Sequence, residues 1–354
     1  PGGVWDLGDP GSRYFKHFSL DLTPTDGETF DCIRWKNQLE QDWQHAERAL
    51  DIYQESSGGS NWQSSVHKNQ HGLVPLKHCG ARCTADGADL AIEKRPSPVV
   101  SARSNTHTES AVIREFWQNF PSAVSCDQRS LSLQVFPRNF PDLFELQGGE
   151  KKHHRLSIDF SGKPDTLHHT QYPAVVSASR GYYAQTQAIP FLSLKDKAQS
   201  AQLRRLIDQG IEGDNSFYAK RERIDEYGWR NYGELYADHE GAYHEGEQPL
   251  VSHYNNQYDP ILGFFQQFFV SGRYEYFDLM DSLARHVVDI DIYHTDKDRA
   301  EYSNGLFWHT DHYLDAETCT HRTISKHHNP ESYWDYQKGG GPGEEHCYSS
   351  GLLM

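Results

Sequence analysis

The sequence predicts a multidomain α+β protein in which an antiparallel β-sandwich is followed by part of an α/α toroid. Up to about Pro190 the apolar residues mostly recur at every second position, as in strands with one solvent-facing side. Beyond that point they recur at steps of three and four, as in helices. A chain of 354 residues is also long for a single core. We therefore predict a β-sandwich domain with inserted helices over residues 1–189 and a helical domain over residues 190–354.

Three stretches of the first half alternate apolar and polar residues, which predicts strands. They are FSLDL at 18–22, RSLSLQVF at 129–136 and RLSIDF at 155–160. Two other stretches have apolar residues at helical spacing and are expected to be the inserted helices. These are RWKNQLEQDWQHAERALDIY at 34–53 and TESAVIREFWQNF at 108–120.

The second half begins and ends its helices with recognisable signals. In DPILGFFQQFFVSG, Asp259 is a suitable N-cap, Pro260 lies in the first turn and Gly272 follows the end. The next stretch, YEYFDLMDSLARHVVDIDIY, is also helical, so the two are expected to form an αα-hairpin. Further helices are expected in SAQLRRLIDQGI and DAETCTHRTIS. Successive hairpins with polar, aromatic connectors predict a toroid, and the chain has room for about half of one, so we expect a truncated ring.

Bulk composition narrows the range of functions. No apolar run reaches the roughly 18 residues that span a bilayer. A formal charge of -16 argues against nucleic-acid and anionic-membrane partners, which need a basic surface. The chain begins with Pro1 rather than Met and shows no signal region, so we expect a fragment or a processed product. The compartment stays open, with an extracellular or periplasmic location favoured.

The cysteines do not form a recognisable metal or redox motif. They are Cys32, Cys79, Cys83, Cys126, Cys319 and Cys347, spaced unlike a zinc ribbon or a thioredoxin site. We interpret Cys79 and Cys83 as ordinary residues or as one disulfide, in preference to the alternative of a metal-binding pair.

Chemically versatile side chains gather in four stretches of the second half. These are KRERIDEYGWRNYGELYADHEGAYHEG at 220–246, SHYNNQYD at 252–259, DIDIYHTD at 289–296 and SNGLFWHTDHYLDAETCTHRT at 303–323. The connectors of a plain helical bundle would be short and rich in Glu and Lys. Here they carry His, Asn, Tyr, Trp and Arg, which are the residue types that bind and transform sugars.

A metal site is the first chemistry to consider. His309 and His312 stand three residues apart, but a zinc site needs a third strong ligand at a recognisable spacing. Asp291, Asp296 and Asp311 could supply hard oxygen ligands to calcium. We therefore predict no metal or other cofactor, with calcium as the alternative.

Glycoside hydrolysis is the second chemistry, and it requires two carboxylates that flank the scissile bond. The candidates are Asp225, Glu226, Asp238, Glu240 and Asp311. Such residues are expected on any chain with this many acids, so their presence decides little.

β-Elimination at a uronic acid is the third chemistry. A base removes the C5 proton, the carboxylate must be neutralised while negative charge develops on it, and the oxygen on C4 leaves. Neutralisation calls for Arg, Asn, His or a cation; the base can be His, Tyr or Lys, and Tyr or His can return a proton to the leaving oxygen. The mixture of His, Tyr, Asn and Arg in the four stretches fits elimination better than a carboxylate pair.

Six motifs in the same order over nearly the whole chain resemble one family, the exo-acting rhamnogalacturonan lyases and their YetA-like relatives, polysaccharide lyase family 26. They are VWDLGDPGS (4–12), REFWQNFP (114–121), ELQGGEKKHH (145–154), ERIDEYGWRNYGELYADHE (222–240), SHYNNQYD (252–259) and GLFWHTDHY (305–313). The resemblance implies a small N-terminal barrel, a central β-sandwich and a C-terminal α/α toroid, and we expect the barrel to be absent from this sequence. It also implies β-elimination of the bond between rhamnose and galacturonate from a chain end of the pectin backbone.

Site residues are assigned where motifs and chemistry agree. The predicted acid and base residues are His253, His309, His312 and Tyr313, and Arg230 and Asn255 are expected to neutralise the substrate carboxylate. Trp229 and Trp308 are expected to stack on sugar rings. The remaining predicted substrate-binding residues are Tyr254, Asn256, Asp311, Arg223 and Arg322.

The predicted function is therefore that of an exo-acting lyase on a pectic oligosaccharide or polysaccharide. Two alternatives remain: a toroid glycoside hydrolase that acts on the same polymer, and a noncatalytic carbohydrate-binding fragment. Because the expected ring is incomplete, the fragment itself is expected to have an incomplete funnel wall.

Overall fold

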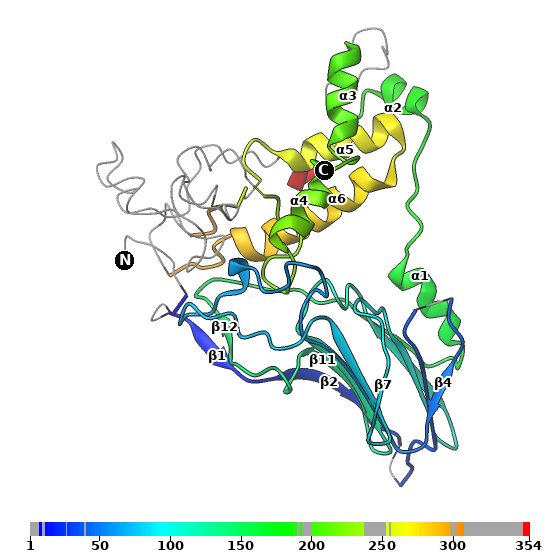
Figure 1. The fold of residues 1–354 in the computed structure, drawn as a ribbon. Helices are drawn as coiled ribbons and strands as arrows, with labels where there is room; N and C mark the ends of the chain where they lie inside the picture. Colours follow the sequence, from blue (N-terminus) through cyan, green and yellow to red (C-terminus); the bar gives the residue numbers. More distant parts are fainter. Residues whose placement is uncertain are drawn as a thin grey trace.

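The computed structural model describes residues 7–8, 11–25, 27–38, 40–189, 192, 200–236, 253–254, 256–297, 300, 303–307 and 350–354. Within these residues, antiparallel sheets come first and helices follow (Figure 1). The predicted mixed architecture, with sheets before helices, is confirmed. The predicted domain boundary at residues 189 and 190 stays a prediction.

Three antiparallel sheets make up the first part of the chain. The six-stranded sheet has the order β2 (Phe18–Leu22), β11 (Leu131–Phe136), β10 (Ser122–Asp127), β5 (Ala49–Gln54), β6 (Ala81–Ala85) and β7 (Ala88–Leu90). The five-stranded sheet has the order β13 (Leu156–Asp159), β9 (Thr108–Ile113), β8 (Val99–Arg103), β3 (Cys32–Lys36) and β4 (Gln44–Ala46). A two-stranded sheet pairs β1 (Arg13–Phe15) with β12 (Phe144–Leu146).

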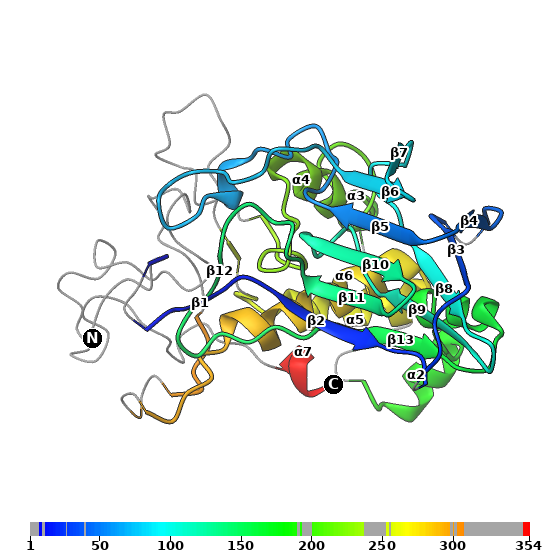
Figure 2. The same ribbon diagram turned by 90° about the horizontal axis from the view of Figure 1, so that it is seen from below.

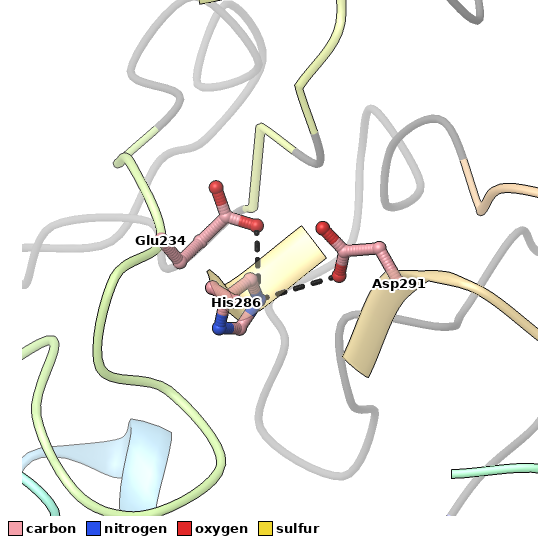
Figure 3. Close-up of side chains that lie close together, drawn as sticks. All are labelled: Glu234, His286 and Asp291. Atoms are coloured by element: carbon pink, nitrogen blue, oxygen red, sulfur yellow. Dashed lines mark ion pairs between the residues drawn. The ribbon is translucent and has the colours of Figure 1, made fainter. Parts of the chain in front are cut away.

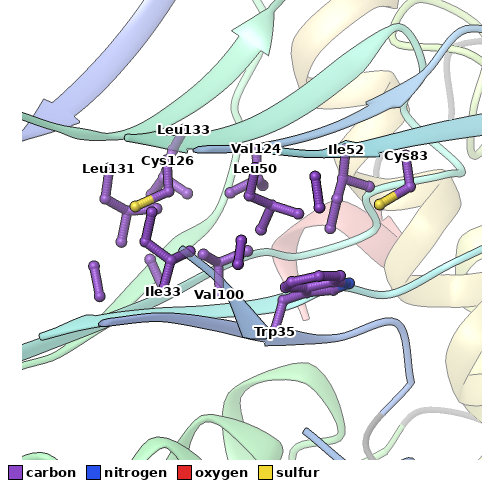
Figure 4. Packing of buried hydrophobic residues seen from close by; sticks show 14 of the residues in the cluster. Ile33, Trp35, Leu50, Ile52, Cys83, Val100, Val124, Cys126, Leu131 and Leu133 are labelled. Atoms are coloured by element: carbon purple, nitrogen blue, oxygen red, sulfur yellow. The ribbon is translucent and has the colours of Figure 1, made fainter. Parts of the chain in front are cut away.

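The two large sheets bury one apolar core between them (Figure 4). Ile33 and Trp35 enter it from the five-stranded sheet, and Ile52, Val124 and Leu133 enter it from the six-stranded sheet. All of these side chains are almost fully buried. In β11 burial alternates along the strand, as the period-two pattern predicts.

The cysteines of the described part serve as ordinary residues. Cys79 and Cys83 are both free, so the disulfide alternative is wrong. Cys83 belongs to the sandwich core, where burial raises the pKa of its thiol to about 11. A thiol kept protonated in this way packs as a small apolar group.

Both helices predicted inside the sandwich are wrong. The stretch 34–53 contains the end of β3, all of β4 and most of β5, and the stretch 108–120 begins with β9. Strand β9 is buried at every position after Thr108, because the sandwich core covers one face and Leu167 packs against Val112 on the other. A strand covered on both faces buries its residues without alternation, and the apolar residues at its end, Val112 and Ile113, then also fit helical spacing with Phe116 and Phe120.

The helices of the second part were largely expected. The described elements are α2 (Arg180–Thr186), α3 (Ala201–Gln209), α4 (Phe217–Ile224), α5 (Pro260–Ser271), α6 (Tyr274–His286), the π-helical turn η4 (Val287–Asp291) and α7 (Ser350–Leu353). Short turns η1 (Ser65–His67), η2 (Pro164–Leu167) and α1 (His168–Gln171) lie nearer the sheets. The predictions of α3, α5 and α6 are confirmed, and the helix predicted at 315–325 lies outside the described residues. None of the described helices has the length and apolarity to cross a bilayer.

Helices α5 and α6 form the predicted αα-hairpin. The Asp259 side chain accepts a hydrogen bond from the Leu262 N–H, Pro260 occupies the first turn, and Gly272 ends α5 in the left-handed conformation. The apolar faces of the two helices meet in a second core that includes Phe268 and Leu283. Sequence signals and packing therefore agree on where this hairpin begins and ends.

The helices lie together on one side of the sandwich (Figures 1 and 2). At the junction a third core joins Phe120 and Phe136 of the sandwich to Trp229 and Tyr232 of the segment after α4. Backbone hydrogen bonds reinforce the contact, including Trp229 N–H to the Phe120 carbonyl oxygen at 2.9 Å. The segment after α4 is therefore held by the sandwich on one side and by the helices on the other.

Candidate functional site

Residues 225–236, which follow α4, provide much of the candidate site. Asp225 ends α4 in the left-handed conformation, with φ of 58°. Further along, Gly233 has φ of 109°, and a Cβ added there would lie 2.2 Å from the carbonyl oxygen of Ser282 on α6. Only glycine permits so close an approach. The backbone therefore brings its neighbour Glu234 directly against α6.

Glu226 and His253 form a buried acid and imidazole pair. The Glu226 Oε1 atom lies 3.3 Å from His253 Nδ1, and the two side chains are 0% and 1% exposed. An isolated antiparallel β-bridge between Tyr236 and His253 places His253 beside the segment after α4 that carries Glu226. Burial is the largest single influence on the pKa of His253 and lowers it, but the carboxylates of Glu226, Glu234 and Asp291 together raise it, so the net shift is upward.

A second buried group brings together Glu234, His286 and Asp291 from three elements (Figure 3). His286 Nε2 on α6 lies 3.3 Å from Asp291 Oδ1 and 3.6 Å from Glu234 Oε2. Asp291 stands at the end of the π-helical turn, which re-aims its side chain relative to a regular helix. Burial, followed by the charge of Asp291, raises the pKa of Glu234 to about 7, and burial lowers that of His286 to about 4.

This second group fits a divalent cation by donor type and spacing. Its three ligand atoms lie within 4.8 Å of one another. Ligands about 2.0–2.1 Å from a tetrahedral zinc ion stand roughly 3.3–3.4 Å apart, close to the His286 distances. Asp291 is one of the three predicted calcium ligands. In the structure it lies beside Glu234 and His286, and not in a group with Asp296. The prediction of a chain without a metal, with calcium as the alternative, stays a prediction.

A cavity of about 90 Å³ opens at the junction between the sandwich and the helical part. We call it the junction cavity. It is lined by Leu7, Val66, His67, Lys68, Pro75, Leu76, Phe120, Pro121, Phe140, Gly228, Trp229, Arg230, Asn231 and His253. Its volume corresponds to about three water molecules, enough for one polar group of a ligand. Three predicted site residues, Trp229, Arg230 and His253, therefore meet on one small cavity.

Arg230 and Trp229 are both firmly held. Arg230 Nε donates to Glu150 at 2.8 Å, and the guanidinium lies 4.3 Å from the centre of the Trp229 ring. Trp229 is only 8% exposed and also packs against Phe136. Within the described residues, Arg230 Nη1 makes no hydrogen bond, so part of the guanidinium fork is available to a ligand. The proposed roles of both residues stay predictions.

Sequence reasoning missed a second histidine on the junction cavity. His67 Nε2 lies 2.7 Å from Asp225 Oδ2, and Asp225 in turn accepts a hydrogen bond from the Ser57 hydroxyl. The His67 ring packs edge-on against Phe120. A carboxylate that orients an imidazole is a common arrangement at proton-transfer sites. Asp225 was visible among the acids of 220–246, but its partner stands 158 residues earlier in a loop without a motif.

The other predicted residues of the described part lie elsewhere. Arg223 is exposed and donates to the Asp214 carbonyl oxygen. Tyr254 packs against the core of α5 and α6, and buried Asn256 accepts a hydrogen bond from the Ile261 N–H at the start of α5. None of these three lines the junction cavity. Their assignment to substrate binding stays a prediction.

Seven predicted site residues lie outside the described part of the chain. They are His309, His312, Tyr313, Asn255, Trp308, Asp311 and Arg322. Whether His253 and His309 share a cleft is therefore still a prediction.

One comparison with known proteins bears on this region. A family model described as the PcRGLX-like protein C-terminal alpha/alpha toroid domain matches residues 173–300. The match covers α2 to η4, and it includes Glu226, Glu234, His253, His286 and Asp291. It supports the toroid part of the predicted fold and, broadly, the resemblance to rhamnogalacturonan lyases. No curated protein gives a significant match.

Proposed function

We propose that this chain is part of a polysaccharide lyase that cleaves the rhamnose to galacturonate bond of rhamnogalacturonan by β-elimination, acting from a chain end. The meeting of Trp229, Arg230 and His253 on the junction cavity is the observation that carries the proposal. The match to the PcRGLX-like toroid domain supports a carbohydrate-active, rhamnogalacturonan-related role. An acidic protein can bind an acidic polysaccharide only where its surface presents a local cation. Arg230 is such a cation on the junction cavity.

In the proposed reaction the C5–H and C4–O bonds break and a double bond forms between C4 and C5. A base takes the C5 proton, and the departing oxygen receives a proton. The substrate carboxylate carries extra negative charge in the transition state, so a fixed cation beside it accelerates the reaction. Arg230 is suited to this role because Trp229 and Glu150 hold its guanidinium in place.

His253 is better suited to be the acid than the base. The Glu226 carboxylate shifts the pKa of His253 upward, which favours the imidazolium near neutral pH. An imidazolium can donate a proton to the departing oxygen or stabilise the developing charge. We assign the complementary base to His67, whose ring is oriented by Asp225 on the same cavity.

The direct test is to incubate the full chain with rhamnogalacturonan and to follow two signals. Elimination creates an unsaturated uronate that absorbs in the ultraviolet, whereas hydrolysis releases reducing ends without that absorbance. Absorbance that rises with the reducing ends supports the proposal. Reducing ends alone would favour the hydrolase, and retention on a pectin column without either signal would favour a binding fragment.

A further inference from the structure

A second and larger cavity has a different chemical character from the junction cavity. Its volume is about 420 Å³, within the range of small-molecule sites. The sandwich contributes Glu115, Lys152 and Arg155 to its wall, the segment after α4 contributes Tyr232, and α6 contributes Arg285 and His286. We call it the lysine cavity. It shares His286 with the buried group of Figure 3, as the junction cavity shares His253 with the Glu226 pair.

Both arginines of the lysine cavity are paired with carboxylates. Arg155 contacts Glu115 closely, and Arg285 Nη2 lies 2.9 Å from Asp281 Oδ1. The third carboxylate of the wall, Asp289, accepts hydrogen bonds from the backbone N–H and the ring of His153. Each acidic group therefore has a partner other than Lys152.

Lys152 is the exception among these cations. In the described part of the chain its ammonium group takes part in no hydrogen bond or ion pair, although Asp289, Glu115 and Glu150 act on it through space. Burial lowers the pKa of Lys152 in spite of these carboxylates. Lys152 is half-buried and lines the cavity, so an anionic ligand there would supply the partner that its ammonium group lacks.

The wall also contains signs of a built site. Glu115 has φ of 56°, a conformation that non-glycine residues rarely adopt, and its carboxylate is held by Arg155. Tyr232 contributes a hydroxyl group, and burial raises its pKa well above the usual value, so it stays a neutral donor. The cavity thus presents one ammonium group without a hydrogen bond or ion pair in the described part of the chain, two guanidinium groups fixed in place and a hydroxyl.

We propose that the lysine cavity is a carboxylate-binding subsite for a uronic acid residue and that Lys152 contacts the carboxylate. The Arg155 and Arg285 side chains would then hold the subsite in shape, and Tyr232 would donate to a sugar hydroxyl. The identity of the sugar rests on the proposed function, whereas the negative charge of the ligand is inferred from the unpaired ammonium group of Lys152. On a chain with a net charge of -16, such a local cation is what an acidic sugar requires.

The test is a binding titration of the full chain by calorimetry. The two probes are a rhamnogalacturonan oligosaccharide and the same oligosaccharide with its carboxyl groups reduced to alcohols. Lys152→Met is the test variant, and Lys151→Met is the matched control, because the neighbouring Lys151 is exposed and lies outside the cavity wall. Lys152→Arg keeps the charge.

We expect Lys152→Met to weaken binding of the acidic oligosaccharide by about tenfold or more, as for a lost hydrogen bond between charged groups. Binding of the reduced oligosaccharide should not change, Lys151→Met should match the parent, and Lys152→Arg should retain most of the affinity. An unchanged affinity in Lys152→Met, an equal loss for both probes, or no binding by the parent chain would overturn the proposal.

A second measurement covers the case in which Lys152→Met does not fold. Amine labelling of the parent chain, mapped by mass spectrometry, should modify Lys152 more slowly in the presence of the acidic oligosaccharide and leave the rate at Lys151 unchanged. Equal labelling of Lys152 with and without the oligosaccharide would contradict the subsite. If binding depends on Lys152 but no ultraviolet absorbance appears, the subsite is retained and the lyase function is rejected. If absorbance appears but binding does not depend on Lys152, the lyase function is retained and the subsite is rejected.

Discussion

At the scale of single residues, the candidate site depends on charges that are buried in pairs. Glu226 and His253 are both almost inaccessible to solvent, and among the described residues the Glu226 carboxylate forms its ion pair with His253. Removal of one member leaves the other as an isolated charge in a medium that solvates it poorly. The pair is therefore a sensitive point for both stability and proton transfer.

We expect Glu226→Ala to lower the free energy of unfolding by about 3–5 kcal/mol, because His253 loses the partner that supports its charge. Urea denaturation measures the change. The matched control is Glu212→Ala, which removes an exposed carboxylate paired with Arg273 and should have almost no effect. Similar losses in the two variants would show that the Glu226 pair is not special.

His154 provides a pH test that is independent of catalysis. Burial is the main cause that lowers its pKa from 6.5 to about 3, so the folded state holds the ring neutral. In the unfolded chain the ring takes up a proton near pH 6.5, which stabilises the unfolded state as the pH falls. The free energy of unfolding is therefore not reduced by His154 above pH 6.5, and it falls progressively as the pH is lowered from 6.5 toward 3.

We expect the free energy of unfolding of His154→Gln to fall less than that of the parent between neutral pH and pH 4, by roughly 3 kcal/mol. Urea midpoints measured across that range provide the comparison. His45→Gln, at an exposed position, should follow the parent curve. A His154→Gln curve as steep as that of the parent would contradict the assignment.

At the scale of elements, the contact between the segment after α4 and helix α6 determines the site geometry. Gly233 lies against Ser282 and allows Glu234 to reach His286. Gly233→Ala should cost roughly 2 kcal/mol or more, since the new Cβ meets backbone in addition to the unfavourable φ. Thermal unfolding measures it. Gly213→Ala is the control, because Gly213 also has a positive φ, of 80°, but an added Cβ there would meet open space. An equal loss of stability in Gly213→Ala would exclude the steric explanation.

Elements with terminal signals could be predicted from the sequence, and elements defined by tertiary packing could not. Asp259, Pro260 and Gly272 marked α5 because capping is a local property. Strand β9 was missed because burial on both faces removes its alternation. The same distinction holds for the site. His253 was found within a motif, whereas His67 lies outside every motif, and Lys152, although within the motif 145–154, gains its role only from residues far away in the chain.

At the scale of the whole molecule, sandwich and helices share one junction. Arg95 of the sandwich makes a two-pronged pair with Glu222 of α4, with both distances 2.8 Å, and Trp229 packs among sandwich aromatics. Both cavities lie at or beside this junction, so neither half contains the candidate site alone.

We therefore expect the two parts to unfold together. Circular dichroism, which monitors the loss of strands, and tryptophan fluorescence, which monitors the exposure of buried tryptophans, should give one coincident transition in urea. Two separated transitions would show that the junction is too weak to couple the sandwich to the helices.

The central claim is elimination at a uronate, and the rate of ultraviolet absorbance on rhamnogalacturonan tests it most directly. We expect the full chain to produce this absorbance and His253→Gln to reduce the rate by about a hundredfold or more, the usual contribution of a positioned acid or base. Cleavage without absorbance, or an unchanged rate in His253→Gln, would contradict the claim.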